Sequence, residues 1–351
     1  MTRSFGARLK LVVFWLAKHA GLFSLSRRVT RRGLRILCYH GVWMSGGHFS
    51  KYLFMSAATF RSRLALLQRL SLPVLSLDDA VKGLANGTLP DCATVITIDD
   101  GWYGTYLEMA PELVRLGLPA TIYLTSYYCE RQFPVFDVAL QFVLSQAGAK
   151  TLDVASLDPA LGGKFRLDTV SDRDAAGDIL QGYARRLNGQ EAFDLLGQIT
   201  LQLGIHLEDM VHPRQFHLMT PAEATEIARQ GIDIQLHTHR HRLVTDDLAV
   251  VTAEITENHK RLEPIASRKL QHFCYPSGAW SPKVWPILER LGIASATTTA
   301  QGLNFPGAPL LGLSRLTDGE CVHDLEFEAE LCGFSELVRR ARSLLRPGTK
   351  P

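Results

Sequence analysis

The sequence predicts an α/β barrel in which helices surround parallel strands, and three observations support this fold class. Short β-rich runs alternate with helical patterns after residue 33, which is typical of a parallel sheet covered by helices. The chain has 351 residues and is 46% hydrophobic, so it can bury a large core. Eight such runs suit closure into a barrel: residues 34–39, 73–77, 93–98, 120–125, 232–237, 271–276, 294–299 and 312–316.

Helices between these strands have recognisable ends. Apolar residues recur at helical spacing over 60–67. Thr220 is placed to cap a helix in which Pro221 is the first residue and Glu223 the third, and Gly231 is placed to close it.

One stretch interrupts the alternation. From about 130 to 216 the chain reads as amphipathic helices with little strand signal, which predicts a helical insertion on a barrel loop. We therefore expect a basic amphipathic segment at 1–32, the barrel at 33–335 and a tail at 336–351 whose end is frayed.

The N-terminal fifth of the chain is strongly basic. No acidic residue precedes Asp78, whereas 13 lysines and arginines do. The apolar patch "LVVFWLA" ends at Lys18 and is shorter than the about 20 residues that a membrane span needs. Three interpretations remain: a helix packed on the barrel with a solvated basic face, a peripheral contact with anionic lipid, and a weak signal peptide.

Nucleic acid is not an expected partner, because no recognised binding motif accompanies the basic residues. The six cysteines are scattered without a C-x-x-C pair, which predicts neither a disulfide framework nor a zinc ribbon and favours a reducing compartment. We expect a cytoplasmic or membrane-peripheral protein, with export as the open alternative.

Two adjacent carboxylates, Asp99 and Asp100, directly follow the predicted strand 93–98 and precede Gly101. The carboxyl ends of barrel strands are where α/β barrels build active sites. Neighbouring carboxylates repel unless a cation or a proton intervenes, so a metal ion is one interpretation. A simple turn at Asp100–Gly101 is the other.

Histidines follow the predicted strand 232–237 in the stretch "HTHRH". His237 and His241 could close on one ion if the chain turns helical after the strand, although a polar histidine-rich loop would have the same composition. Together with Asp100 they supply three ligands and leave metal positions open for water and substrate, as hydrolysis requires. Asp99 is then free to act as a base.

Three motifs in this order resemble a known family. "TIDDG" (97–101), "HTHRH" (237–241) and "FCYPSG" (273–278) are similar to the first three motifs of the polysaccharide deacetylases with a NodB-homology domain, carbohydrate esterase family 4. The resemblance implies a distorted (β/α) barrel of the NodB-homology type, here with a helical insertion. It also implies removal of acetyl groups from sugars, with Asp99 as general base and Asp100, His237 and His241 as metal ligands.

The chain departs from the family's common pattern at two positions. The third motif usually carries an arginine that orients the base, but Cys274 stands there, and Arg315 at another strand end is the expected substitute. The usual C-terminal Leu-x-His element, which supplies the general acid, is missing. His323 is the only late histidine, and its polar setting favours a surface loop.

A different histidine can supply the acid. "ILCYHGV" (36–42) resembles the N-terminal YH element of the branch that includes exopolysaccharide poly-N-acetylglucosamine deacetylases, and this resemblance makes His40 the candidate acid. A core histidine bonded to backbone is the alternative.

The resemblance also suggests substrate contacts. The backbone N–H of Ser277 matches the family's oxyanion donor, and Tyr275 in the same motif is assigned to the same oxyanion and substrate-binding group. Trp102 and Tyr103 follow the metal motif and could stack on a sugar, although core packing explains them equally well.

Together with these residues, the resemblance implies a metal-dependent deacetylase that acts on N-acetylated sugars of a poly- or oligosaccharide or of its precursor. The expected cofactor is one divalent ion, with Zn²⁺ as the default and Ni²⁺, Co²⁺ or Fe²⁺ as alternatives for such a ligand set. The alternative function is a non-catalytic carbohydrate-binding protein on the same barrel.

Overall fold

The structure is a computed structural model that describes residues 5–44, 53–148, 150–211 and 213–345. The expected frayed end of the chain, at 346–351, lies outside the described residues.

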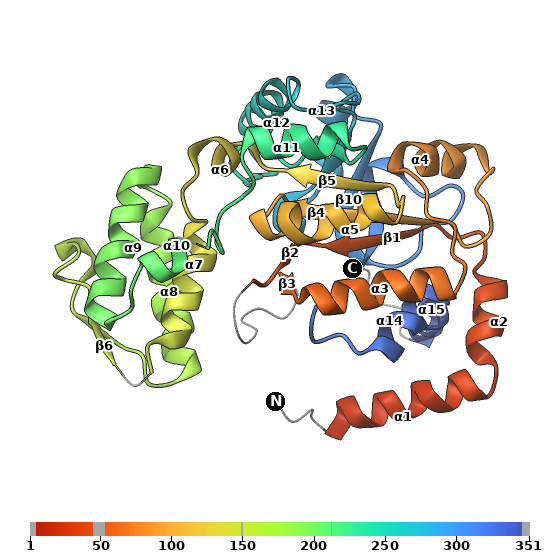
Figure 1. Cartoon of the computed structure of the whole chain (residues 1–351), viewed down its shortest axis with the longest axis horizontal. Helices are drawn as coiled ribbons and strands as arrows, with labels where there is room; N and C mark the ends of the chain where they lie inside the picture. Colours follow the sequence, from red (N-terminus) through yellow and green to blue (C-terminus); the bar gives the residue numbers. More distant parts are fainter. Residues whose placement is uncertain (1–4, 45–52, 149, 212, 346–351) are drawn as a thin grey trace.

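Seven parallel strands form a closed barrel at the centre of the molecule (Figure 1). The ring closes because β1 pairs with two neighbours: Leu37 lies opposite Ile96 of β4 and Leu316 of β11. In order around the ring the strands are β1 (Arg35–Tyr39), β11 (Leu313–Thr317), β10 (Ser295–Gln301), β9 (His272–Cys274), β8 (Asp233–Leu236), β5 (Ala120–Leu124) and β4 (Thr94–Asp100).

This ring confirms the predicted fold class with one correction. The run 73–77 is no barrel strand, because Val74 makes only an isolated bridge to Thr94. Ser76 instead caps a helix by accepting a hydrogen bond from the Asp79 N–H. The apolar run therefore leads into a helix and adds no eighth strand.

Helices cover the outside of the barrel wall (Figure 1). Side chains alternate across each strand, so Ile96 and Ile98 of β4 pack outward against helices while Val95 belongs to the cluster that fills the interior. The surrounding helices are α3 (Ala57–Arg69), α5 (Ala110–Arg115), α6 (Ser126–Arg131), α11 (Pro221–Arg229), α12 (Leu248–Leu262) and α13 (Trp285–Arg290). Helix α4 (Leu77–Asn86) instead packs its buried apolar residues into the interior cluster.

The predicted cap of α11 is present. The Thr220 hydroxyl accepts the Glu223 N–H at 3.2 Å, and the Glu223 carboxylate accepts the Thr220 N–H at 2.7 Å. Both bonds satisfy donors that a helix start would otherwise leave unpaired. The chain leaves this helix through Gly231 at φ 102°.

Residues 136–211 form a separate group of helices beside the barrel, seen at the left of Figure 1. A short antiparallel hairpin, for which the sequence gives little signal, accompanies them. An apolar cluster joins these helices to Trp43, Phe54 and Trp102 near the end of β4. The elements are α7 (Phe136–Gln146), β6 (Thr151–Asp153), β7 (Lys164–Arg166), α8 (Val170–Ala184), α9 (Gly189–Leu203) and α10 (Glu208–Val211).

The two ends of the described chain pack on each other. Phe14 of α1 and Phe23 of α2 both contact Phe334, with ring centroids 5.6 and 5.3 Å apart. The elements are α1 (Phe5–His19), α2 (Leu22–Val29), α14 (Asp324–Leu331) and α15 (Phe334–Leu345). Two short strands, β2 (Gly41–Val42) and β3 (Phe54–Met55), pair near the end of β1.

Candidate metal centre and active site

Asp99 and Asp100 are the last two residues of β4, and both are buried. Adjacent residues on a strand point to opposite sides, so the two carboxylates enter different surroundings. The chain then turns through left-handed residues, with φ 70° at Asp100 and 86° at Gly101. A Cβ at Gly101 would lie 2.2 Å from the Leu124 Cδ1 and at a strained positive φ, so a larger residue would force Leu124 to move and would strain this turn.

Asp100, His237 and His241 bring three potential ligand atoms together, one from each residue. The Asp100 Oδ1 lies 3.2 Å from the His237 Nε2 and 3.3 Å from the His241 Nε2. Such a group, two imidazole nitrogens and one carboxylate oxygen, could hold a divalent metal ion. The structure therefore brings the three predicted ligands together.

The hydrogen bonds around these atoms fit a metal site. The His237 Nδ1 lies 2.8 Å from the Cys274 carbonyl oxygen, which can only accept, so the proton belongs on Nδ1 and the Nε2 lone pair faces Asp100. The Trp102 indole N–H donates to the other carboxylate oxygen of Asp100 at 2.8 Å. One oxygen of Asp100 is thus fixed and the other faces the two histidines.

The electrostatics of the site favour a positive charge. Burial alone would lower the pKa of His237, but the hydrogen bond to Asp100 and the nearby Asp99 carboxylate outweigh it and raise that pKa above its usual value. Burial would likewise raise the pKa of Asp100, yet His241 and His237 hold it well below the usual range. A cation between these groups would meet the same preference.

The loop after β8 reaches this arrangement without the helical turn that the sequence suggested. Thr238 and His241 have φ values of 62° and 53°, so the chain bends twice through left-handed residues. Asn258 of α12 accepts the His237 N–H at 2.9 Å and holds the strand end. His239 is buried at 2.9 Å from the Ser126 hydroxyl, which gives it a structural contact away from the ligand group.

Asp99 faces the barrel interior and meets Arg315 of β11. The guanidinium donates two parallel hydrogen bonds of 2.7 Å to the two carboxylate oxygens, and both side chains are almost fully buried. Its Nε donates to the Thr298 carbonyl at 2.8 Å, so the arginine is fixed from both sides. Burial would raise the pKa of Asp99, but Arg315 outweighs it and lowers that pKa to about 2.

His40 follows β1 and lies at the same rim. Its Nε2 is 3.8 Å from the Asp99 Oδ2, and its side chain is 23% exposed, so the ring borders both the base and solvent. His323, the alternative acid, lies elsewhere: it is the exposed N-cap of α14, where its Nδ1 accepts the Leu325 N–H. Of these two histidines, only His40 lies beside Asp99.

The remaining predicted contacts have mixed placements. Trp102 is 2% exposed and packs on Phe54, so the core-packing interpretation applies and no face is open to a sugar. Tyr275 is also buried; its hydroxyl donates to the Leu311 carbonyl and its N–H to the Thr297 carbonyl, so both of its donors are already engaged within the protein. Ser277 lies in an exposed turn directly after β9, at φ 54°.

Tyr103 remains partly exposed, but Arg214 covers one ring face at 3.8 Å. Two thiols that the sequence did not single out as contacts also touch the base: the Cys38 and Cys274 Sγ atoms lie 3.7 and 3.5 Å from the Asp99 Oδ2. The sequence could have identified both cysteines as neighbours of the site, because each lies near the carboxyl end of its strand, β1 or β9.

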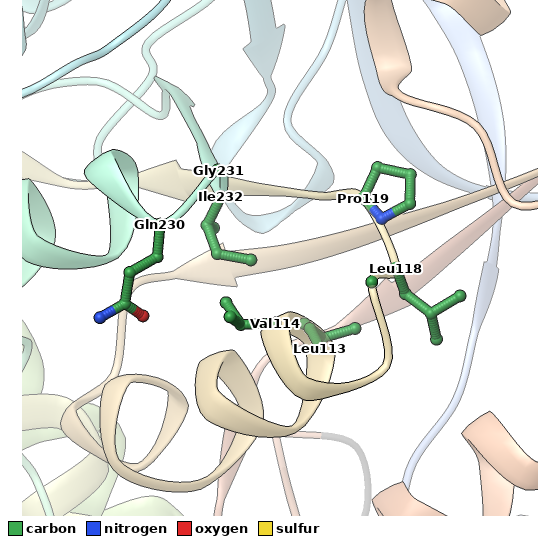
Figure 2. A pocket seen from close by; sticks show the side chains of 8 residues that line it. Leu113, Val114, Leu118, Pro119, Gln230, Gly231 and Ile232 are labelled. Atoms are coloured by element: carbon green, nitrogen blue, oxygen red, sulfur yellow. The ribbon is translucent and has the colours of Figure 1, made fainter.

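A separate apolar hollow lies far from this rim (Figure 2). Pro119 and Ile232 in its lining come directly before β5 and β8, so it opens at the opposite ends of the strands from Asp99 and His237. It holds none of the predicted site residues.

Comparison with known proteins gives one family match. The family model described as polysaccharide deacetylase matches residues 86–296, which include Asp99, Asp100, His237 and His241 but neither His40 nor Arg315. No curated protein sequence matches the chain significantly.

Solved structures share the fold at low identity. The Streptococcus pyogenes deacetylase PplD, in complex with acetate, matches with a TM-score of 0.54 and 15% identity over 85% of this chain and 98% of its own. IcaB from Ammonifex degensii has the same score and identity over 86% and 97%. A de-N-acetylase from Aggregatibacter actinomycetemcomitans scores 0.53, with 14% identity over 85% and 99%.

Proposed function

Because this chain belongs to the polysaccharide deacetylase family, we propose that it is a metal-dependent hydrolase that removes N-acetyl groups from a saccharide polymer, an oligosaccharide or a precursor. The observation that carries this proposal is the convergence of Asp100, His237 and His241 beside a buried carboxylate, Asp99.

The donor set fits one divalent ion held by Asp100, His237 and His241, with zinc as the default. Such an ion, when bound, polarises an acetyl carbonyl and lowers the pKa of water. Trp102 and the Cys274 carbonyl orient two of the ligands through the bonds described above, as outer partners of metal ligands commonly do.

In this proposal Asp99 is the general base. A base must be ionised to accept a proton, and Arg315 keeps Asp99 ionised at neutral pH. The low pKa also makes Asp99 a weak base. It could therefore take a proton only from a water molecule whose own pKa is lowered, as a bound divalent ion would do. The bidentate contact fixes the direction in which the carboxylate faces, and Arg315 thereby fills the orienting role of the arginine that the third motif lacks.

His40 is the proposed general acid. An amine leaves an amide only if it receives a proton, and His40 is the neighbouring side chain that can donate one. Its place after β1, 3.8 Å from Asp99, agrees with the position of the YH element, and we assign the chain to that branch on this ground. The Ser277 N–H, in the turn after β9, is the proposed donor to the oxyanion.

A non-catalytic carbohydrate-binding protein would need the metal ligands but not the base. The buried Asp99–Arg315 pair, which costs desolvation, argues for retained chemistry.

The test is acetate release from acetylated amino sugars by wild type and Asp99→Asn, with metal content measured by elemental analysis. We expect Asp99→Asn to keep about one ion per chain and lose at least about 100-fold in turnover. Asp233→Asn is the matched control, because Asp233 is a buried carboxylate at the opposite end of β8. Near-normal turnover by Asp99→Asn would refute the assigned base.

A further inference from the structure

Helix α1 is apolar on its outward side as well as on the side that packs on the protein. Its two lysines lie about half exposed at the border with α14, where Lys10 pairs with Glu326 at 2.8 Å and Lys18 with Glu328 at 2.7 Å. Phe14 and Ala17 are buried between them against α14 and α15. A surface helix normally turns its apolar face inward and its charges outward.

The outward side of α1 is apolar. Residues at helical spacing opposite Phe14 are about half exposed: Leu9 54%, Val12 53% and Leu16 55%, with Val13 and Trp15 beside them. Figure 1 shows α1 along the lower edge of the molecule with α14 between it and the barrel, so this side faces away from the protein.

Helix α2 extends the apolar surface. Leu22, Leu25 and Val29 are 42%, 56% and 60% exposed, whereas Phe23 and Ser26 are buried. Together the two helices hold eight of the seventeen exposed large hydrophobic residues in the described part of the chain. Single exposed apolar residues need no explanation, but a group of this size marks an interaction surface.

The charged residues of α1 and α2 themselves are all basic. Residues 5–29 contain no carboxylate, and exposed arginines border the apolar positions: Arg8 on α1, Arg28 on α2 and Arg32 just after it. The Trp15 ring packs at a tilt of 33° on the His19 ring, with ring centroids 4.0 Å apart, which places an aromatic ring at the boundary between apolar and basic positions. Apolar residues beside arginines and tryptophan are typical of helices that lie in a membrane interface.

We propose that α1 and α2 form a docking surface for the anionic face of a lipid bilayer. The apolar side chains would enter the boundary between headgroups and acyl chains, and the arginines would meet anionic headgroups. A second copy of the chain fits this surface less well, because a symmetric contact would bring the arginines of both copies together with no carboxylate in the segment between them.

A contact with the bilayer surface also fits the geometry better than insertion across it. Among the described residues, no single helix has the length and apolar character of a membrane span; α1 and α2 meet these criteria only as a pair that is bent by 79°. The salt bridges of Lys10 and Lys18 to α14 would have to break before α1 could enter the bilayer.

The test is binding of the full chain to sedimented vesicles of phosphatidylcholine, alone or mixed with phosphatidylglycerol. We expect binding to the mixed vesicles and an at least about tenfold loss of affinity in Val12→Asn/Leu16→Asn. Arg28→Gln/Arg32→Gln should lose about fivefold per arginine on mixed vesicles, a loss that added salt reproduces in wild type. Brominated lipid in the vesicles should quench the tryptophan fluorescence of wild type more strongly than that of Trp15→Phe, because Trp15 would lie in the lipid interface.

Leu201→Asn is the matched control, because Leu201 is 80% exposed on α9, away from this surface. It should bind vesicles as wild type does. All these positions are exposed, so thermal unfolding and acetate release in solution should stay unchanged and exclude misfolding as the cause.

Three results would overturn the proposal. The first is equal vesicle affinity of wild type and Val12→Asn/Leu16→Asn. The second is a wild-type dimer that ignores vesicles and dissociates in that variant, which would assign the surface to a second copy. The third is release of wild type from vesicles by detergent but not by high salt at alkaline pH. This result would indicate that α1 and α2 span the bilayer as a pair. Vesicle binding is measured without substrate, so its outcome is independent of the proposed deacetylation.

Discussion

Replacing Arg315 by glutamine would leave the Asp99 carboxylate buried without its counter-charge. The structure allows the effect to be worked out, because both side chains are almost fully buried and joined by two bonds of 2.7 Å. Breaking a buried pair typically costs about 3–5 kcal/mol. The lowered pKa of Asp99, from 3.8 to about 2, corresponds to a net stabilisation of the ionised form of roughly 2 kcal/mol.

The pH dependence of this loss has a definite sign. A depressed carboxyl pKa stabilises the folded protein above the unfolded value of 3.8, and that contribution disappears as the pH falls toward about 2. In Arg315→Gln burial should raise the pKa of Asp99, so the variant regains stability when Asp99 is protonated. The difference in urea-unfolding free energy between wild type and Arg315→Gln should therefore shrink as the pH falls from neutral, first through the raised pKa of the variant and then through the window between 3.8 and about 2.

Activity should respond in the same variant. Without Arg315, burial dominates and raises the pKa of Asp99, so less of the base is ionised and turnover should fall at least about 100-fold at neutral pH. Metal content should stay at the wild-type level. The hydrogen bonds of Arg315 go to Asp99, Thr97 and Thr298, and none of these is a proposed metal ligand. Arg315→Lys keeps the charge and should recover part of the loss.

A second buried arginine provides the control. Arg63 donates to Asp318 at 2.7 Å and is equally buried, but it joins α3 to the segment after β11. Arg63→Gln should lower the free energy of unfolding by a similar amount without moving the pH dependence of turnover. Wild-type turnover and an unmoved pH profile in Arg315→Gln would refute the role assigned to the pair.

Three further outcomes are expected. His40→Ala should reduce turnover of amide substrates about 100-fold and that of ester substrates less, with unchanged metal content, because an alkoxide needs less help from an acid than an amine does; equal losses would contradict the assignment. Trp102→Phe removes the 2.8 Å bond to Asp100 and should weaken metal binding about 10–100-fold in a chelator competition. Burial lowers the pKa of His272 to about 4, so the urea midpoint of unfolding should fall as the pH drops from 6.5 toward 4. The fall should be smaller in His272→Asn. Equal pH dependence of the midpoint in wild type and His272→Asn would argue against that histidine as the cause.

The strands of the barrel are readable from the sequence because each is a short apolar run that ends in polar or turn residues. Seven of the eight predicted runs are strands. The exception, 73–77, has the same composition, but Ser76 starts α4 and only Val74 bridges to β4. Composition alone does not distinguish a strand from the lead-in to a helix.

The proximity of Asp100, His237 and His241 was predictable for the same reason that the strands were. Carboxyl ends of parallel strands meet at one rim, so motifs that follow β4 and β8 must lie close together. The backbone that joins His237 to His241 was not predictable. Thr238 is β-branched and adopts φ 62°, a conformation that such residues rarely take, and tertiary contacts fix it there.

The position of Arg315 required the closed barrel. It is 216 residues from Asp99 in sequence, and its strand pairs with β1 and β10, not with β4. Because β1 lies between β11 and β4, the guanidinium meets the carboxylate only across the barrel interior. A sequence pattern can offer an arginine at a strand end, but ring closure decides which carboxylate it reaches.

Two adjacent aspartates can coexist at the end of β4 because the strand sends them to different counter-charges. Asp99 points inward and is neutralised by Arg315, which belongs to the protein. Asp100 faces His237 and His241, which carry a charge only when they are protonated, so the charge of Asp100 has to be balanced by bound protons or by a cation. Arg315 makes Asp99 a fixed, ionised group, whereas Asp100 remains open to a metal ion. The strand's alternation thus assigns two chemical roles to two identical side chains.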